Sequence, residues 1–476
     1  MSRPRPATHA PLPSHLRPGA IPRGGAGEHP GAAVKKGWQT KTLGEVCEVM
    51  NGGTPKTGVP EYWDGSHLWI TPAEMGKRLS PYVCDTERKI TDLGLRDSSA
   101  RMLPPNSVIL SSRAPIGHLV INTEPMATNQ GCKGLIPDRQ LQHKFLYYYL
   151  SSIVDLLNSL GTGATFKELS GGKLKEVTIP VPPLPEQQPI VGILDEAFEG
   201  IATAKANAEK NLQNARALFE SVLNVAIQGK LIPQNPGDAS VADLLSQIEK
   251  LRSGAISQGR AKPVKTSPIE TDDEYQLELP KSWKWAQLEC LTVGISDGVH
   301  KKPEYSADGI PFITVKNLTA GPGICFDDLN YITQADHEDF IRRTHPEKGD
   351  ILITKDGTIG VVRLIDTDIE FSIFVSVALI KPVMHELAPY LVYALCASCV
   401  QGQIVPQGAA LKHLYLVDLR RLAVPLPPLS EQKRIVAKLD ALTTETQHLA
   451  SLYEQKLAAL GALKKSLLHH AFTGNL

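Results

Sequence analysis

The chain has 476 residues, of which 42% are hydrophobic, so it can bury more than one core and is too long for a single ordinary domain. Its 50 basic and 50 acidic residues cancel, which argues against a dedicated non-specific nucleic-acid binder, a class that is usually strongly basic. The sequence lacks a run of about 18 apolar residues, an apolar leader and a paired cysteine framework, so we expect a cytoplasmic protein without membrane helices.

Residues 1–37 form a segment rich in Pro, Gly, His and Ala, with six basic residues and one acid. Such a composition buries too little apolar surface to offset the entropy lost on ordering, which predicts a disordered N-terminal extension. A dispensable tail is favoured over a basic arm that contacts DNA.

Residues 38–183 are predicted to form a globular α+β domain with a strand-rich core. Runs of β-forming residues at 107–110 and 177–181 alternate with Gly and Pro, and the pattern at 145–160 is typical of a helix. The Gly-rich segment 51–56 predicts a turn rather than a phosphate-binding loop.

A long helix is predicted within residues 184–231, directly after a Pro-Pro-Leu sequence. Apolar residues recur at spacings of three and four from Ile190 to Ala226, with one additional spacing of four at Ala208. This period is that of a coiled-coil seam with a stutter, and about 40 helical residues span roughly 60 Å.

A linker is predicted over residues 232–280, containing a short helix at 241–251 with Asp238 or Ser240 as its N-cap. It has no counterpart in the first part of the chain.

The second half of the chain repeats the first with an offset of 245 residues, which predicts a second globular domain at 281–428 and a second long helix at 429–476. The same offset relates Trp38 to Trp283, Gly163 to Gly408 and Lys167 to Lys412. It also relates residues 181–187 to residues 426–432, and residues 229–231 to residues 474–476. In this half we expect strands at 351–354 and 371–380, a helix at 389–399 and Ser430 as the helix N-cap.

The two long helices are expected to pair within one chain as an antiparallel coiled coil. The first seam is rich in Ala, whereas the second, from Ile435 to Ala471, is rich in Leu, so large side chains can fill the space that small ones leave. The order of the segments then predicts one globular domain at each end of the pair, related by a pseudo-twofold axis. The outer face, including Glu209 and Glu454, is expected to be free for a partner.

Motifs of catalysis are missing from the sequence. It has no Gly-x-x-x-x-Gly-Lys-Ser/Thr loop, no Asn/Asp-Pro-Pro-Tyr sequence and no His-Glu-x-x-His motif. Cys396 and Cys399 have Cys-x-x-Cys spacing, but they lie in an apolar run without a second pair, which favours buried core thiols over a metal site. We therefore expect neither a catalytic residue nor a metal site in this chain.

Two variable segments, each followed by Pro-Pro-Leu-x-Glu-Gln and a long helix ending in Gly-x-Leu, resemble the DNA-specificity subunits of type I restriction-modification systems. The resemblance covers residues 38–476, and Pro189 departs from the basic residue that is usual at its position. The residues that carry it at the starts of the helices are Pro183, Leu184, Glu186, Gln187, Pro428, Leu429, Glu431 and Gln432.

The resemblance implies that each globular segment is a target recognition domain that reads one half of a split site in double-stranded DNA. It also implies that the helices are a spacer and a docking surface for two methyltransferase subunits, which motor-nuclease restriction subunits then join. S-adenosylmethionine, ATP and magnesium are expected on those partners, with no cofactor in this chain. Two alternatives stay open: the targeting component of a related modification enzyme, and a structural coiled-coil protein with two adaptor domains.

Residues that contact DNA are expected among cations and amides in polar loops beside strands, because these groups bind phosphates and base edges. For each of them a solvated surface position is the alternative. The candidates are Lys56, Arg113, Asn129, Gln130, Lys133, Lys167, Lys301, Lys302, Lys355, Lys412 and His413.

Overall fold

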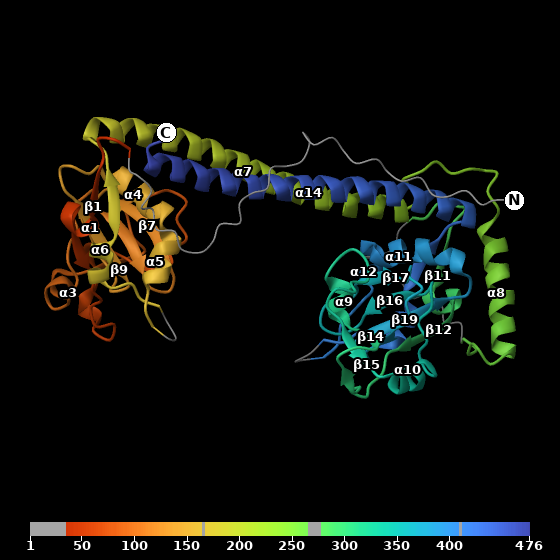
Figure 1. The fold of residues 1–476 in the computed structure, drawn as a ribbon. Coiled ribbons are helices and arrows are strands. Elements are labelled where there is room, and N and C mark those ends of the chain that lie inside the picture. Colours follow the sequence, from red (N-terminus) through yellow and green to blue (C-terminus); the bar gives the residue numbers. More distant parts are fainter. Residues whose placement is uncertain (1–34, 164–166, 265–277, 409–411) are drawn as a thin grey trace, which may run out of the picture. The chain divides into compact units, whose positions relative to one another are not determined.

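The computed structural model describes residues 35–163, 167–264, 278–408 and 412–476. The described chain forms two compact units (Figure 1), one reaching to Lys205 and including Ala458–Leu476, and the other comprising Ala206–Leu457. We call them unit 1 and unit 2. The N-terminal extension predicted at 1–37 lies almost entirely outside the described residues. Within these ranges, no helix has the length and apolar character needed to cross a bilayer.

Unit 1 contains a five-stranded sheet in the order β2-β9-β6-β7-β4, a three-stranded sheet β5-β3-β8 and the pair β1-β10. Its strands are β1 (Gln39–Thr42), β2 (Cys47–Asn51), β3 (Trp63–Ile70), β4 (Tyr82–Val83), β5 (Arg88–Ile90), β6 (Val108–Ser112), β7 (Ile116–Asn122), β8 (Met126–Thr128), β9 (Cys132–Pro137) and β10 (Thr178–Val181). Its helices are α1 (Leu43–Val46), η2 (Pro60–Tyr62), α2 (Pro72–Met75), α3 (Asp92–Arg96), α4 (His143–Ser152), α5 (Val154–Leu160) and α6 (Gly171–Glu176), followed by the first part of α7 (Leu184–Ile227).

Unit 2 has two four-stranded sheets, β12-β19-β16-β17 and β13-β15-β14-β18, and the pair β11-β20. Its strands are β11 (Lys284–Gln287), β12 (Thr292–Asp297), β13 (Tyr305–Ser306), β14 (Ile310–Ile313), β15 (Asn330–Ile332), β16 (Ile351–Thr354), β17 (Val362–Leu364), β18 (Ser372–Ile373), β19 (Val377–Pro382) and β20 (Ala423–Leu426). Its helices are α8 (Val241–Ser257), η4 (Leu288–Leu291), α9 (Val315–Thr319), α10 (Gln334–Ile341), η5 (His385–Leu387), α11 (Ala388–Cys396), α12 (Ser398–Gln401) and α13 (Leu416–Arg421), with most of α14 (Leu429–Thr473).

The sequence repeat is a structural repeat, so the predicted α+β fold with two repeated domains and two long helices is confirmed. β1 pairs with β10 through Gln39 and Val181, and β11 pairs with β20 in the same register through Lys284 and Leu426. In the central hairpins the offset becomes 243, because Val108 opposite Ile121 corresponds to Ile351 opposite Leu364. The segments that connect the strands therefore differ slightly in length between the two units, while the pairing of the strands is the same.

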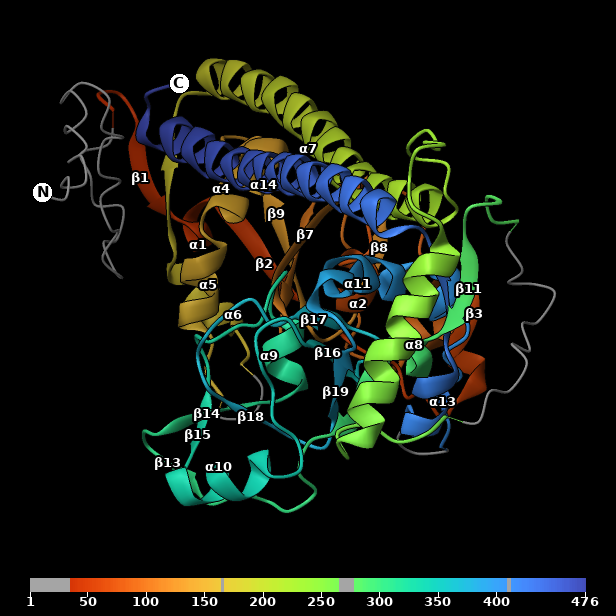
Figure 2. The same cartoon turned by 90° about the vertical axis from the view of Figure 1, so that its right-hand side faces the viewer.

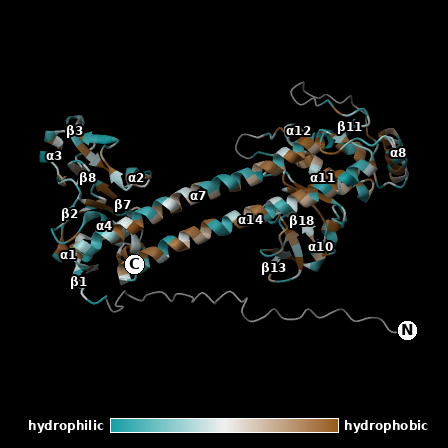
Figure 3. Ribbon diagram, turned by 90° about the horizontal axis from the view of Figure 1, so that it is seen from above, coloured by the Kyte–Doolittle hydropathy of each residue, from teal (hydrophilic) through white to brown (hydrophobic). Residues whose placement is uncertain are grey.

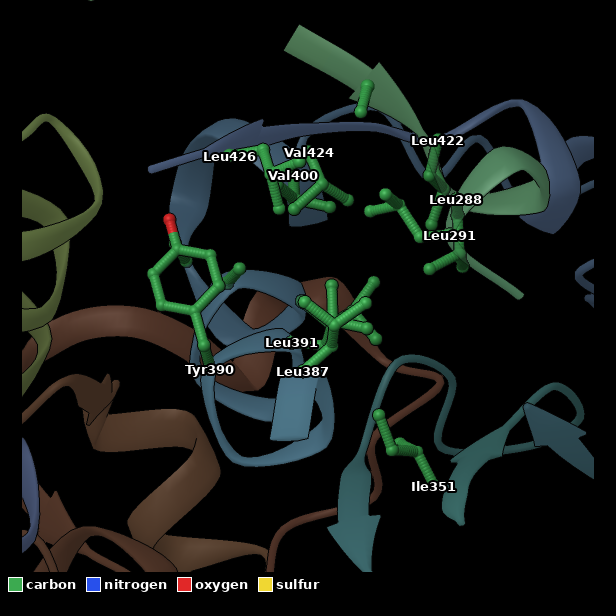
Figure 4. Packing of buried hydrophobic residues seen from close by; sticks show 14 of the residues in the cluster. Leu288, Leu291, Ile351, Leu387, Tyr390, Leu391, Val400, Leu422, Val424 and Leu426 are labelled. Carbon is green, nitrogen blue, oxygen red and sulfur yellow. The ribbon is translucent and has the colours of Figure 1, made fainter. Parts of the chain in front are cut away.

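The core of unit 2 forms where α11 lies between the β16 sheet and the β11-β20 pair. Figure 4 shows Leu288, Leu391 and Val424 pointing into this core, and all three are fully buried. Tyr390 is also fully buried, and its hydroxyl donates a 2.7 Å hydrogen bond to the Pro425 carbonyl of β20. Burying apolar surface contributes about 25 cal/mol per Å², while the hydrogen bond prevents an unpaired phenol in the core.

The long helices run antiparallel within each unit, as the order of the segments predicts. In unit 1, Leu194 near the start of α7 shares a core with Ala471 near the end of α14. In unit 2, Ala226 near the end of α7 shares a core with Leu439 near the start of α14. Figure 3 shows apolar and polar residues alternating along both helices.

Every predicted seam position of α7 is buried or half-buried, which confirms the coiled-coil period of this helix. In α14 the seam is also followed, except that Leu449 and Lys464 are exposed. The ammonium of Lys464 lies 5.0 Å from the centre of the Phe198 ring, which is an attractive cation–π arrangement.

Glu454 is exposed on the helix pair, as expected of a residue on its outer face, and it also pairs with the neighbouring helix. Its carboxylate accepts a 3.1 Å hydrogen bond from the Arg216 guanidinium of α7. Glu209 also has an interaction partner. The seam period fixes which residues face the partner helix, but it leaves open which flanking charges meet.

Three predicted elements are each divided in the structure. The helix expected at 145–160 is broken at Ile153 into α4 and α5, and the helix expected at 389–399 is broken at Ala397 into α11 and α12. The strand expected at 371–380 is split into β18, which pairs with β14, and β19, which pairs with β16. An unbroken strand could not join both sheets, so the backbone turns between them.

The linker helix α8 (Figure 2) is longer than the predicted 241–251. It packs beside β12 and η4 of unit 2. Ser240 is its N-cap and accepts a hydrogen bond from the amide of Ala242. The other cap candidate, Asp238, instead accepts hydrogen bonds of 2.9 and 2.7 Å from the Arg434 guanidinium. These bonds, together with one from Ser430, lower the pKa of the Asp238 carboxyl to about 2.

Candidate nucleic-acid interface

In each unit the chain changes sheets at a short loop, and a second loop packs against it. In unit 1 the amide of Gly53 donates a 2.9 Å hydrogen bond to the Thr128 carbonyl at the end of β8. In unit 2 the amide of Val299 donates a 3.1 Å hydrogen bond to the Ile373 carbonyl at the end of β18. We call these paired loops the switch loops. They place polar side chains at one edge of the main sheet.

The unit 1 switch loops bring together several predicted candidates. The Asn129 amide donates a 3.0 Å hydrogen bond to the Thr54 hydroxyl, and its carbonyl oxygen accepts a 2.8 Å bond from the amide of Gly131. Gln130, next in the chain, is exposed. Asn129 therefore holds the loop in shape, whereas Gln130 is free to meet a ligand.

Arg113 lies in the turn between β6 and β7, next to the same loop. An added Cβ on Gly131 would lie 3.0 Å from Arg113 Nε and 3.1 Å from its Cγ, so the stem of the side chain packs on this glycine. Arg113 is half-buried, and the described residues provide no hydrogen bond or ion pair for its guanidinium. The five N–H donors of this fork are available to a ligand.

Lys133 departs from the predicted loop position, because it lies within β9 and is only 6% exposed. Burial lowers the pKa of its ammonium, while the nearby carboxylate of Glu168 opposes this shift and the Arg113 guanidinium adds to it. Lys133 thus adds positive charge beneath the edge rather than on its surface. Lys56 and Lys167 are both exposed on loops, as predicted.

In unit 2 the corresponding edge is built around two aspartates. Asp297, at the end of β12, accepts a 2.7 Å bond from the Arg343 guanidinium, and its other oxygen lies 3.1 Å from His300 Nε2. Its carboxylate also lies 3.9 Å from the Lys355 ammonium. Asp297 is 7% exposed, so it is a buried anchor for these surrounding cations.

The second aspartate, Asp356, joins two predicted candidates. Its carboxylate accepts a 2.6 Å hydrogen bond from His413 Nδ1 and lies 3.7 Å from the Lys355 ammonium. Lys301, Lys302 and Lys412 are exposed, and Lys412 directly precedes His413 in the chain. The structure therefore brings Lys355 and His413 together through Asp356.

An open pocket at this edge contains cations that the sequence analysis missed. It is lined by Val299, His300, Lys301, Asp339, Phe340, Arg342 and Arg343. The doublet of arginines directly after α10 was the available signal in the sequence. In the repeat α10 corresponds to the shorter helix α3, and each of the two helices is capped by a threonine that directly follows a strand. Within the described ranges, no group of three or more His, Cys, Asp or Glu residues is arranged to hold a metal.

The Pro-Pro-Leu-x-Glu-Gln sequences attach each long helix to its globular part. The Gln187 side chain is fully buried and donates hydrogen bonds of 2.9 and 2.8 Å to the carbonyls of Pro182 and Gln140. Gln432 repeats the first of these bonds with the Pro427 carbonyl, at 2.9 Å. These residues are structural anchors.

The prediction of Ser430 as the N-cap is wrong, because α14 already begins at Leu429, as α7 begins at Leu184. The Pro183 and Pro428 carbonyls accept the first helical bonds. The Ser430 hydroxyl donates to Asp238 instead. In the first helix the chain stays helical through Pro189.

Comparison with known proteins identifies the fold and the family. A model of the type I restriction modification DNA specificity domain matches residues 35–213 and 298–455. The type I restriction enzyme MjaIX specificity subunit of Methanocaldococcus jannaschii is 26% identical over 448 residues, which cover 93% of this chain and 94% of that protein. The EcoR124I/EcoR124II specificity subunit of Escherichia coli is 36% identical over 163 residues, covering 33% of this chain and 40% of that protein.

Solved structures show the same fold. A chain from a type I restriction-modification complex aligns with a TM-score of 0.61 at 20% identity, covering 93% of this chain and 99% of that chain. The HsdS subunit from Thermoanaerobacter tengcongensis aligns with a TM-score of 0.51 at 19% identity, covering 93% and 98% of the two chains.

Proposed function

We propose that this chain, which belongs to the family of type I restriction-modification DNA-specificity proteins, reads a bipartite DNA site with its two units. The observation that carries the proposal is that cations and amides cluster on and beside the switch loops of both units, at the same edge of a repeated fold. Each unit reads one half of the site, and base contacts come from this edge. The long helices act as a spacer between the two halves.

Catalysis belongs to partner subunits in this proposal. Two methyltransferase subunits dock on the helices, motor-nuclease subunits join them, and S-adenosylmethionine, ATP and magnesium bind those partners. Docking is supported by apolar side chains that α7 and α14 leave exposed: Leu218 is 50% exposed and Leu452 is 46% exposed. Alone, this chain binds DNA and transfers no methyl group.

A domain exchange tests the independence of the two readers. Residues 38–180 are replaced by the same segment of a relative with a different site, and methylation sites are mapped in cells that also express the methyltransferase subunit. We expect one half of the recognised site to change while the other half is retained. A change in both halves would show that the units do not read separately.

A spacer variant tests the role of the helices. Adding two whole turns to both α7 and α14 preserves their seam and lengthens each helix by about 10 Å. We expect the unread gap to grow by about three base pairs, at about 3.4 Å per base pair, with both half-sites unchanged. An unchanged gap in an active complex would contradict the spacer role.

Partner docking is tested by replacing Leu218 and Leu452 with Lys, using Lys at the exposed position Gln213 as the control. We expect the double variant to lose co-purification with the methyltransferase subunit while its thermal unfolding stays unchanged, because both side chains are solvated in the isolated chain. Normal co-purification would place the docking surface elsewhere.

A further inference from the structure

The two switch-loop edges share a backbone arrangement that carries different side chains. In unit 1, Glu168 forms isolated bridges with Thr162 and Arg113, and in unit 2 His413 forms the same bridges with Gln407 and Asp356. The backbone hydrogen bonds agree as well. The amide of Leu169 donates to the Ser112 carbonyl at 2.9 Å, and the amide of its counterpart Leu414 donates to the Lys355 carbonyl at 2.8 Å. Arg113 and Asp356 therefore occupy equivalent positions, as do Glu168 and His413.

The side chains at these equivalent positions differ in charge. Unit 1 presents the Arg113 guanidinium, which has no partner among the described residues. Unit 2 presents a carboxylate that is already bound to His413 at 2.6 Å. The neighbouring lysines Lys167 and Lys412, by contrast, are exposed in both units and match each other in the repeat.

This contrast separates two kinds of DNA contact. A residue that stays the same in two readers with different targets carries no sequence information, which is the property of a phosphate contact. A pair that differs on an identical backbone can distinguish bases. An arginine fork binds O6 and N7 of guanine, whereas a carboxylate accepts from N4 of cytosine.

We propose that the equivalent pairs Arg113/Glu168 and Asp356/His413 are specificity-determining positions, with Arg113 reading a guanine in the half-site of unit 1. The inference rests on the proposed function. Arg113 is suited to this role because its stem packs against Gly131, which directs the fork before DNA arrives. Asp356 fixes His413 in the same way in unit 2.

The test uses the full chain with its methyltransferase subunit and a library of randomised duplex DNA as the probe. The base frequencies selected by Arg113→Gln and Asp356→Asn are compared with those of the unchanged protein. We expect Arg113→Gln to reduce the preference for guanine at one position of one half-site by roughly 5- to 150-fold. Asp356→Asn is expected to alter one position of the other half-site only.

Three further variants separate base reading from charge and from folding. Arg113→Lys keeps the charge and should keep the salt dependence of binding while it loses guanine preference, because lysine lacks the planar fork. Gly131→Ala keeps the arginine but displaces it, and should relax the same position even if Arg113→Gln fails to fold. Arg139→Gln, beyond the other end of β9, is the matched control and should change nothing.

The outcomes are distinguishable. If the unchanged protein selects no sequence, the proposed function fails and the inference fails with it. If the unchanged protein selects a bipartite site and Arg113→Gln lowers affinity equally for every sequence, with a salt slope reduced by about one, Arg113 contacts a phosphate and the inference alone is overturned. A change in the same half-site by Arg113→Gln and Asp356→Asn would also overturn it.

Discussion

Replacing the buried glutamine at the start of each long helix should destabilise unit 1 more than unit 2. We consider Gln187→Met and Gln432→Met, which keep the volume of the side chain and remove its polar atoms. Both glutamines are buried, at 0% and 1% exposure. Any difference between the variants therefore reflects the number of hydrogen bonds that each residue makes.

The structure gives different numbers of bonds at the two positions. Gln187 bonds to the carbonyls of Pro182 and Gln140 and accepts a 2.8 Å bond from the amide of Gln142. Gln432 keeps only the Pro427 bond, and its Oε1 is buried without a partner among the described residues. A buried group left unpaired costs about 1–3 kcal/mol, and two of the three Gln187 bonds are only partly buried. We therefore expect losses of about 3 kcal/mol for Gln187→Met and about 1 kcal/mol for Gln432→Met.

Hydrogen exchange measured by mass spectrometry resolves the two units, because peptides from α4 and α11 report on each separately. A difference of about 2 kcal/mol corresponds to a roughly 30-fold larger increase in exchange for α4 in Gln187→Met than for α11 in Gln432→Met. Gln213→Met, at an exposed position of α7, serves as the control. Equal increases for the two variants would refute the assignment of the difference to hydrogen bonds.

Three further predictions concern charges. Arg216→Glu and Glu454→Arg should each lower the free energy of unfolding by about 0.5 kcal/mol, since the pair is largely exposed, and the double variant should recover it; thermal unfolding that shows no recovery would contradict the contact. The lowered pKa of Asp238 contributes stability that is complete above the ordinary carboxyl pKa and is lost as the pH falls through about 2. The stability of Asp238→Asn should therefore converge with that of the unchanged protein between about pH 4 and pH 2. A difference in thermal unfolding that stays constant with pH would exclude this linkage. Lys167→Gln and Lys412→Gln should each reduce the salt slope of DNA binding by about one without altering the selected sequence, and an altered sequence would remove them from the phosphate contacts.

The repeat and the helix seams could be predicted from the sequence because both are periodic signals. Seam residues from Ile190 to Ala226 follow the helical period, and the doubled Pro-Pro-Leu sequence marks where each helix begins. Both signals are found by comparing the sequence with itself, so they can be recognised without knowledge of the fold.

Contacts between distant segments could not be predicted in this way. The partner of Glu454 depends on how far the helices are displaced along each other, and the role of Asp238 depends on where the linker meets α14. The split of the strand at 371–380 follows from the presence of two sheets, which the apolar run by itself does not indicate. The burial of Lys133 follows from the position of β9 inside its sheet.

For the candidate interface, the type of residue and its position in a loop predicted which cations belong to it. They did not predict which acidic residues those cations contact. Lys355 and His413 were expected as separate DNA contacts, whereas the structure joins them through Asp356. Arg343 directly follows α10, and its bond to Asp297, together with its place in the pocket beside His300 and Lys301, shows that it belongs to the same edge.

Gly229 packs closely against Pro280 in unit 2, where a Cβ added to the glycine would lie 2.4 Å from Pro280 Cγ. The repeat places Gly474 against Lys35 in unit 1 in the same way, and a Cβ added to Gly474 would lie 2.5 Å from Lys35 Cβ. In unit 2 the two contacting residues belong to one continuous stretch of chain, whereas in unit 1 they come from opposite ends of the sequence. The segment order is therefore cyclic. A recognition domain, a helix, a second recognition domain and a second helix follow one another in a closed cycle. The linker joins the first helix to the second domain, and the equivalent junction between the second helix and the first domain is the one that the chain leaves unconnected. A gene rearranged to begin at residue 278, with a connector joining residues 476 and 35, would specify the same set of pairings.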